Sequence, residues 1–267
     1  MNYPTTKDGW VSLSSLGNKM KILLPFKKTK HFNKMLERGK IKSGIRISKK
    51  SITFNFSIIP VKKKVYGEVV GLDKGIKNVY TLSSGESSIP DIHGHTFDSI
   101  LQRMTRKKKG SKAFKRCQDH RKNHINWSLN QIDFSNVKTL VIENIKRMRY
   151  KNKASNFLNR FTYTDIDVKL ANLSLENGVR FLKTNPTYTS QRCSKCGWTR
   201  KTNRKGKKFV CGACDFACDA DLNASVNISF DLPEISKAER LKHKNKNGFY
   251  WNALGKEPIV PCVQEAI

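Results

Sequence analysis

Four cysteines in the sequence have the type and spacing of ligands for one soft metal ion. Two CxxC pairs, separated by fourteen residues, supply them: Cys193, Cys196, Cys211 and Cys214. Four thiolates favour a tetrahedral zinc ion, because each CxxC knuckle directs two sulfur atoms toward the same point. A thioredoxin-like redox centre would show one such pair, not two. We therefore predict a closed, structural zinc site that performs no chemistry of its own.

Three carboxylates are candidates for the chemistry that a closed zinc site cannot perform. Asp73 and Glu143 each end an apolar run, and Asp221 opens the helix-like segment DLNASVNI. Each acid alone is weakly informative, since acids at strand ends are often solvated and an Asp before a helix is commonly an N-cap. Convergent carboxylates, however, are the ligands of Mg²⁺, and a two-metal site can hydrolyse a phosphodiester. Together the acids predict such a centre.

These groups must be positioned by folded elements, which the apolar pattern predicts. Alternating or continuous apolar runs predict strands, and apolar residues three and four apart predict helices. The expected strands lie within 66–86, 137–145 and 179–186, and the expected helices within 96–132, interrupted at Gly110, and 165–178. Elements in this order predict an α/β core with a mixed sheet. Residues 1–66 read as β-rich, with strands at KMKILLPF and SITFNFSII.

The charge balance points to a polyanionic partner. Lys and Arg number 52 against 21 Asp and Glu, so the formal net charge is +31. This excess is larger than solubility requires and favours nucleic acid as the partner. The densest run of candidate phosphate contacts comprises Arg106, Lys107, Lys108, Lys109, Lys112 and Lys115.

Other sequence features argue against a membrane partner. There is no signal-peptide pattern and no run of about 18 apolar residues. Seven cysteines, four of them in CxxC pairs, fit a reducing compartment better than a disulfide framework. The expected location is therefore the cytoplasm, in association with the nucleoid if the protein is prokaryotic.

Several segments occur in the order found in a known family. GLDKGIKN, RKKKGSKAFKR, LVIENI, TSQRCSKCG, CGACDF and DADLNASVNI resemble the TnpB nucleases associated with insertion sequences, which are relatives of compact type V CRISPR effectors. The resemblance covers roughly residues 60–230. The combination is specific, although each segment alone is not.

The resemblance implies a RuvC-like, RNase H fold with a zinc ribbon inserted directly before the helix that bears the last catalytic acid. By motif position, it implies that Asp73, Glu143 and Asp221 are the magnesium-binding catalytic acids. Asp219 competes with Asp221 for the third role. Arg204 matches an arginine that some relatives place near the scissile phosphate.

The expected organisation follows from these motifs. It comprises a partial, wedge-like β-barrel segment at 1–65, a RuvC-like core with a basic helical insertion at 66–188, a zinc ribbon at 189–217, the last nuclease motif and helix at 218–232, and a tail at 233–267. Family members usually begin with a longer N-terminal portion that includes a helical recognition lobe. We therefore expect a shortened N-terminus, for which a second copy, a partner chain or structured RNA would compensate.

The activity implied by the resemblance is RNA-guided cutting of DNA, with a guide RNA and a target DNA as partners. Base pairing would then carry the sequence specificity, and the protein would recognise backbone shape and charge. Two alternatives remain: an RNA-bound module that binds DNA without cutting it, and a truncated remnant that binds nucleic acid without specificity. A Holliday-junction resolvase is less favoured, because a ribbon has no role there. The presence of all three acids favours the nuclease.

Overall fold

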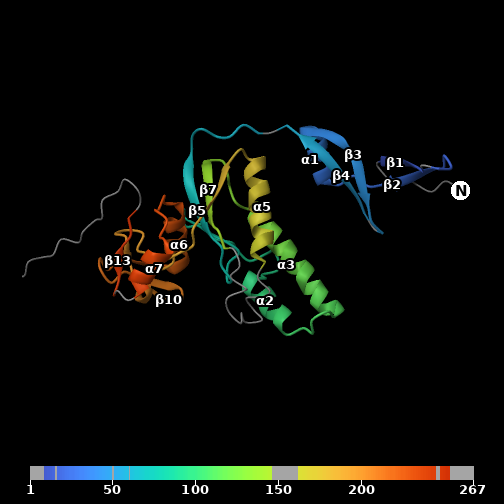
Figure 1. Cartoon of the computed structure of the whole chain (residues 1–267). Coiled ribbons are helices and arrows are strands. Elements are labelled where there is room, and N and C mark those ends of the chain that lie inside the picture. The colour runs from blue at the N-terminus through green and yellow to red at the C-terminus, as the bar shows by residue number, and fades with distance from the viewer. Residues whose placement is uncertain are drawn as a thin grey trace, which may run out of the picture. The chain divides into compact units, whose positions relative to one another are not determined.

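The computed structural model describes residues 9–15, 17–49, 51–59, 61–145, 162–244 and 247–252 (Figure 1). Contacts divide the chain into two units, Met1–Pro60 and Val61–Ile267, and each is described by itself. Among the described residues, no helix combines the length and the apolar character needed to cross a membrane. Parts of the predicted core and tail, residues 146–161 and 253–267, lie outside the described residues.

The first unit consists of two β-hairpins and a helix. Strand β1 (Gly9–Ser14) pairs with β2 (Lys21–Phe26), and β3 (Gly39–Ile47) pairs with β4 (Ile52–Ile58), both antiparallel. In the described part of this unit the strands form two separate sheets. The predicted strands are therefore confirmed, but they do not close into a barrel.

The helix of this unit, α1 (Lys30–Arg38), was not expected from the sequence. Thr29 caps its N-terminus by accepting a hydrogen bond from the backbone N–H of Phe32 at 3.1 Å. The Phe32 ring packs against Phe54 and Phe56 of β4, with ring centroids 5.1 and 5.4 Å away. The short apolar stripe was hidden by the many lysines and arginines around it.

A four-stranded mixed sheet forms the centre of the second unit. Its order is β6 (Thr81–Leu82), β5 (Glu68–Asp73), β7 (Val137–Glu143) and β8 (Arg180–Thr184). Strand β6 is antiparallel to β5, whereas β5, β7 and β8 run parallel to one another. The central strands are continuous apolar runs because both faces of a parallel sheet are covered. The predicted α/β core with a mixed sheet is thereby confirmed.

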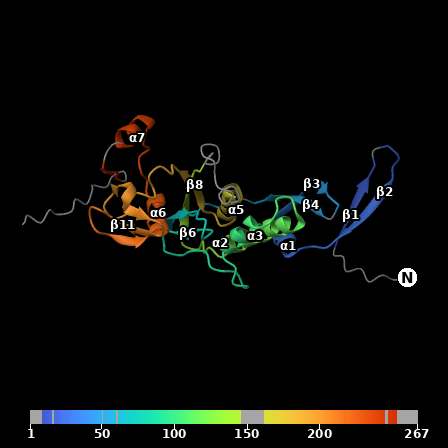
Figure 2. The same ribbon diagram turned by 90° about the horizontal axis from the view of Figure 1, so that it is seen from below.

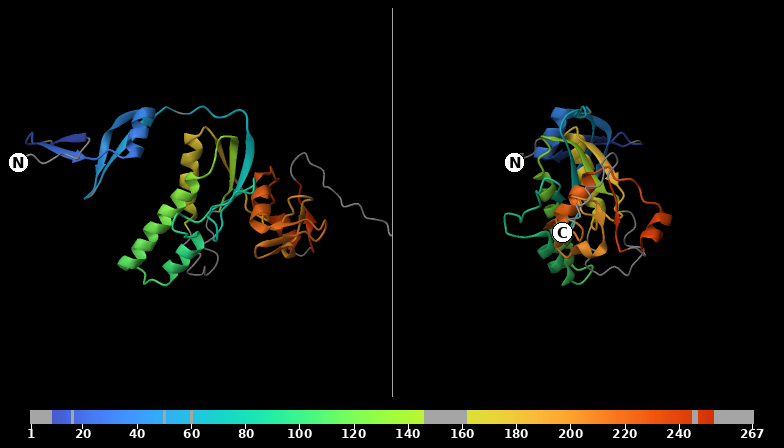
Figure 3. Two further views of the ribbon diagram at one scale, coloured as in Figure 1. Left: turned by 180° about the vertical axis from the view of Figure 1, so that it is seen from behind. Right: turned by 90° about the vertical axis from the view of Figure 1, so that its left-hand side faces the viewer.

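Helices cover the two faces of this sheet (Figure 1). The helices α2 (Phe97–Thr105), α3 (Lys112–Asn130) and α5 (Tyr163–Glu176) lie on one side, with Gly110 in a positive-φ turn between α2 and α3. The helix α6 (Ala220–Ser229) lies on the other side, as the reverse view also shows (Figure 3).

A glycine allows α6 to approach the sheet closely. A Cβ added to Gly71 of β5 would lie 2.0 Å from the backbone oxygen of Ser225 and 2.6 Å from the backbone nitrogen of Ser229. Any larger residue would therefore push the helix away. This close packing places the first turn of α6 beside the ends of β5 and β7.

A small cysteine-rich lobe connects β8 to α6. A three-stranded antiparallel sheet of β10 (Arg204–Lys205), β11 (Lys208–Val210) and β12 (Ala217–Asp219) forms its centre. Strand β9 (Trp198–Thr199) and the 3₁₀ turn η2 (Lys201–Asn203) precede them. The described part of the C-terminal tail adds α7 (Lys237–Lys244) and β13 (Phe249–Tyr250), which pairs with β9. Figures 1 and 2 show α6 between this lobe and the main sheet.

Candidate active site

Two of the predicted acids meet at the carboxyl ends of the two central strands of the main sheet. Leu72 of β5 is paired with Ile142 of the parallel strand β7, so Asp73 and Glu143 follow them at neighbouring strand ends. The carboxylates are close enough that Glu143 acts on the charge of Asp73. The parallel register therefore joins two acids that are seventy residues apart in the chain.

The third acid, Asp221, comes from the first turn of α6 and is 7% exposed. Its charge also acts on Asp73. The competing residue, Asp219, is the N-cap of the same helix, where its Oδ1 accepts hydrogen bonds from the backbone N–H groups of Asp221 (2.8 Å) and Leu222 (3.2 Å). Asp219 thus has a local structural role, and this supports the choice of Asp221.

Two cations from the cysteine-rich lobe hold the Asp221 carboxylate. Arg204 donates from Nη2 to Oδ1 at 2.8 Å, and Lys207 donates from Nζ to Oδ2 at 2.5 Å. The structure thus places Arg204 beside Asp221, whereas a position near the scissile phosphate, implied by the resemblance, stays a prediction. Lys207 was missed, because nothing in the run KTNRKGKKF distinguishes it from its basic neighbours. Both cations are partly exposed and can also reach an anionic ligand.

Glu143 is held by two further residues that sequence reasoning missed. Thr189 donates its hydroxyl hydrogen to Oε1 of Glu143 at 2.5 Å, and Lys74 donates to the Glu143 backbone oxygen at 3.1 Å. The fully buried Lys74 also bonds Asp167 of α5 at 2.6 Å, and Asp167 in turn bonds Lys183 of β8. These contacts hold the carboxyl ends of β5, β7 and β8 in place. Lys74 directly follows Asp73 in the sequence, but no sequence signal links Thr189 to Glu143.

The three acids line or adjoin a small cavity suited to a hydrated cation. A cavity of about 250 Å³ is lined by Asp73, Glu143, Asn144, Ile145, Pro186, Thr189 and Ser190. At about 30 Å³ per water, it has room for a cation that keeps several of its waters. The carboxylate oxygens of the three acids do not all lie within 4.8 Å of one another. Joint coordination of one cation by all three acids therefore requires at least one of these side chains to move.

Burial and repulsion between carboxylates raise the pKa values of two acids at this site. Burial, together with the nearby carboxylates of Glu143 and Asp221, raises the pKa of Asp73 to about 7, because Arg204 and the backbone N–H of Lys74 lower this pKa by less. Burial also raises the pKa of Glu143, against the lowering effects of the Thr189 hydrogen bond and of Lys74. Hard oxygen donors in such a cluster fit a divalent cation, which would take the place of the bound protons.

The raised pKa predicts that, without added divalent cation, Asp73 destabilises the fold as pH rises. Between about pH 4 and pH 7 the folded state holds a proton on Asp73 that the unfolded state has lost, so unfolding becomes easier with rising pH. The substitution Asp73→Asn should remove this contribution. The unfolding free energy of the variant minus that of the wild type should grow over this range by an amount on the order of a few kcal/mol. Denaturant titrations at several pH values measure it.

This test of the Asp73 pKa needs a control variant and a measurement with added Mg²⁺. Asp119→Asn replaces an exposed carboxylate of α3 and should show no such growth. Adding Mg²⁺ near pH 7 should stabilise the wild type more than Asp73→Asn. A pH-independent difference between Asp73→Asn and the wild type would contradict the buried, raised-pKa assignment.

The four cysteines converge as predicted. Their Sγ atoms all lie within 4.8 Å of one another, with 3.7 Å between Cys193 and Cys214 and 3.6 Å between Cys196 and Cys211. Zinc–sulfur bonds of about 2.3 Å in a tetrahedron place sulfur atoms about 3.8 Å apart, so the cluster fits a structural zinc ion. Cys218 lies outside this group of four ligands and packs against it.

The predicted phosphate contacts lie on the α2–α3 hairpin. All six side chains are exposed, at the turn between the helices and along the first part of α3: Arg106, Lys107, Lys108, Lys109, Lys112 and Lys115. They form a cationic patch that no element of the fold requires. Their role in binding remains a prediction.

Comparison with known proteins confirms the resemblance noted in the sequence. Residues 163–228, from α5 to α6, match the family described as Cas12f1-like, TNB domain. The chain is 39% identical over 107 residues to the CRISPR-associated endodeoxyribonuclease Cas12f1 of Sulfoacidibacillus thermotolerans, which is 39% of this chain and 24% of that protein. The match to the family model therefore includes the cysteine-rich lobe and Asp221.

Two further relatives come from other bacteria. The putative RNA-guided DNA endonuclease InsQ of Escherichia coli K12 is 31% identical over 112 residues, which is 40% of this chain and 28% of that protein. A TnpB-like protein of Aquifex aeolicus is 34% identical over 98 residues, which is 34% of this chain and 32% of that protein. The aligned segments thus span less than a third of the length of each of these three relatives.

Proposed function

We propose that this chain, a relative of TnpB-like and Cas12f1 proteins, is an RNA-guided DNA endonuclease that cuts phosphodiesters at Asp73, Glu143 and Asp221. The observation that carries the proposal is the meeting of these acids from β5, β7 and α6, where the charges of Glu143 and Asp221 both act on Asp73. The names of the relatives, an endodeoxyribonuclease and a putative RNA-guided DNA endonuclease, support the substrate and the guide.

In this proposal the acids hold magnesium, which when bound activates the attacking water and stabilises the leaving oxygen. Thr189 and Lys74 keep Glu143 in place, so that its carboxylate needs little rearrangement. Arg204 and Lys207 hold Asp221 in the absence of nucleic acid. When DNA enters, we expect Arg204 and Lys207 to turn toward the scissile phosphate. The Asp221 carboxylate would then be available to magnesium.

The domain roles belong to the same proposal. Residues 66–188 and 218–232 would form a RuvC-like core, 189–217 a zinc ribbon, 1–65 a wedge-like segment and 233–267 a tail. The ribbon supplies Arg204 and Lys207 to the acid cluster, which gives a physical reason for its place directly before α6. The cationic patch on the α2–α3 hairpin would contact phosphates of the guide–target duplex.

Sequencing of the RNA that co-purifies with the full chain tests this function, with the protein expressed beside its native flanking DNA. One discrete RNA with a constant scaffold is expected. The purified complex should then cut DNA that matches the variable part of this RNA in the presence of Mg²⁺, and should leave mismatched DNA intact. A discrete RNA without cutting would favour a non-cutting binding module, and a random mixture of cellular RNA would favour non-specific binding; either result would overturn the proposal.

A further inference from the structure

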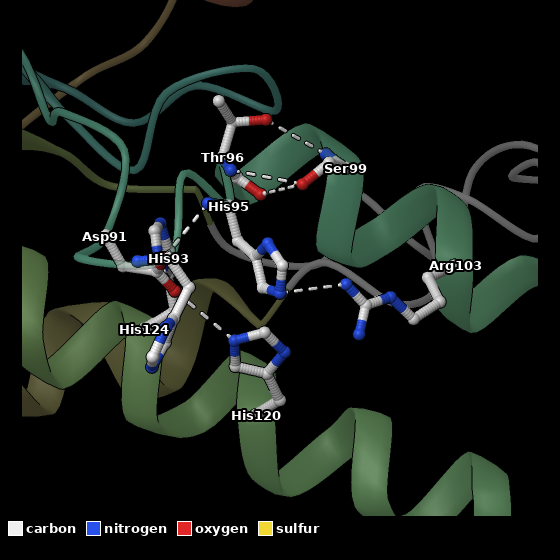
Figure 4. A network of polar contacts seen from close by, with 8 residues as sticks. All are labelled: Asp91, His93, His95, Thr96, Ser99, Arg103, His120 and His124. Atoms are coloured by element: carbon white, nitrogen blue, oxygen red, sulfur yellow. Dashed lines mark hydrogen bonds and ion pairs between the residues drawn. The ribbon is translucent and has the colours of Figure 1, made fainter.

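Four of the six histidines gather around one aspartate, and the nuclease proposal uses none of them. His93 and His95 come from the loop before α2, whereas His120 and His124 come from α3 (Figure 4). Their imidazoles surround Asp91, with the His95 and His120 rings 5.1 Å apart. Imidazole and carboxylate groups together are the donors that borderline transition-metal ions prefer.

Asp91 is held in position by the loop that carries it. Its Oδ1 accepts hydrogen bonds from the backbone N–H groups of His93 and His95, both at 2.9 Å. Its Oδ2 faces α3, where it lies 3.4 Å from Nε2 of His120 and 3.8 Å from Nδ1 of His124. One carboxylate oxygen thus faces two imidazole nitrogens while the other fixes the loop.

His124 is the unusual member of the group. It is 3% exposed, and neither ring nitrogen has a hydrogen-bond partner among the described residues. A buried polar group without a partner is costly, and such groups commonly mark a missing ligand or ion. Burial also lowers the pKa of His124, which favours the neutral form that metals bind.

The contact of Asp91 Oδ2 with His120 is a long hydrogen bond, but the spacing of its contacts with both histidines also fits coordination of a shared ion. Metal bonds of about 2.0–2.1 Å in a tetrahedron place ligand atoms about 3.3 Å apart, close to the 3.4 and 3.8 Å measured from Asp91 Oδ2. A hydrogen bond at 3.8 Å would be too long. His120 and His124 are four residues apart on one helix, the spacing at which two helical histidines share a metal ion.

We propose that Asp91 Oδ2, His120 and His124 form a binding site for a divalent transition-metal ion such as zinc. The three ligand atoms do not yet all lie within 4.8 Å of one another. The His120 side chain is 29% exposed, and a rotation of its ring toward His124 would close the site. Arg103 donates to Nε2 of His95 at 3.1 Å, so we assign the remaining coordination position to water rather than to His95.

The bound ion would tie the loop before α2 to the middle of α3. That loop carries Asp91, and α3 is the helix whose first turns bear part of the cationic patch. Its consequence would be local rigidity of the hairpin, independent of cutting at the acid cluster. The site therefore stands or falls separately from the proposed nuclease function.

A calorimetric zinc titration of the full chain tests this site. The four-cysteine cluster is first filled to one zinc per chain, as checked by elemental analysis. A further equivalent of zinc should then bind near pH 7.5, and should be lost near pH 5, where imidazoles are protonated. His120→Gln should weaken this second binding by at least about tenfold, since even loss of an outer-shell partner often has that effect.

Two further variants keep the result decisive. His124→Gln should weaken the second binding in the same way; if this buried substitution prevents folding, His120→Gln decides alone. His31→Gln, an exposed histidine of the first unit, should leave the second binding unchanged. Absence of a second equivalent, or its persistence in His120→Gln, would mean that the cluster is a set of ion pairs and hydrogen bonds only.

Discussion

The substitution Asp221→Asn is expected to abolish DNA cleavage, by at least about 10²–10³-fold, while the protein retains its RNA. The amide keeps the shape of the carboxylate but loses its charge. It can then neither ligate a hard cation strongly nor balance Arg204 and Lys207, which bond both oxygens of Asp221. Cleavage of guide-matched DNA in Mg²⁺ measures the first effect, and the RNA content of the purified complex measures the second.

A matched control comes from the neighbouring acid. Asp219→Ser retains an oxygen that can cap α6, so we expect a change in stability of about 1 kcal/mol or less and nearly normal cleavage. Cleavage by pure Asp221→Asn at the wild-type rate would remove Asp221 from the catalytic centre. Loss of cleavage in Asp219→Ser, with its fold intact, would assign the third role to Asp219 instead.

Cys196→Ser is expected to lose zinc and to unfold the cysteine-rich lobe. Structural zinc sites contribute an apparent binding free energy of about 10–16 kcal/mol in small domains, and this lobe has few other buried apolar groups. Its core is the cysteine cluster with Phe209 and Ala220. Elemental analysis should find less than one zinc per chain, and hydrogen exchange should accelerate over residues 190–216.

The same substitution should also weaken cleavage, because Arg204 and Lys207 are held by the lobe that unfolds. Cys218→Ser is the matched control, since this cysteine belongs to the lobe but not to the cluster. It should keep zinc, hydrogen-exchange protection and cleavage. Full zinc occupancy in Cys196→Ser would show that the four cysteines do not act as one site.

Much of the fold could be predicted from local patterns. Apolar runs gave the positions of β5, β7 and β8, and helical spacing gave α2, α3 and α5, because each element is selected by the side chains that it buries. The two CxxC pairs predicted their own cluster, since a knuckle fixes two ligands locally. The helix α1 was not predicted, because its apolar residues Phe32 and Met35 lie among basic residues.

The tertiary structure decided which side chains meet. The parallel register of β5 and β7 sets Asp73 beside Glu143, and the missing side chain of Gly71 lets α6 bring Asp221 to them. The contacts of Lys74 and Thr189 with Glu143 and of Lys207 with Asp221 join separate segments, and no local pattern predicts them.

In the histidine cluster, too, sequence spacing predicts one part and the tertiary structure decides the other. His120 and His124 share a helix face by sequence spacing alone, whereas Asp91 joins them only through the path of the loop before α2. The sequence by itself thus determined the elements and the cysteine ligands, because both depend on spacing within short segments. Only the tertiary structure decided the composition of the acid and histidine sites, because contacts between distant segments depend on register and packing.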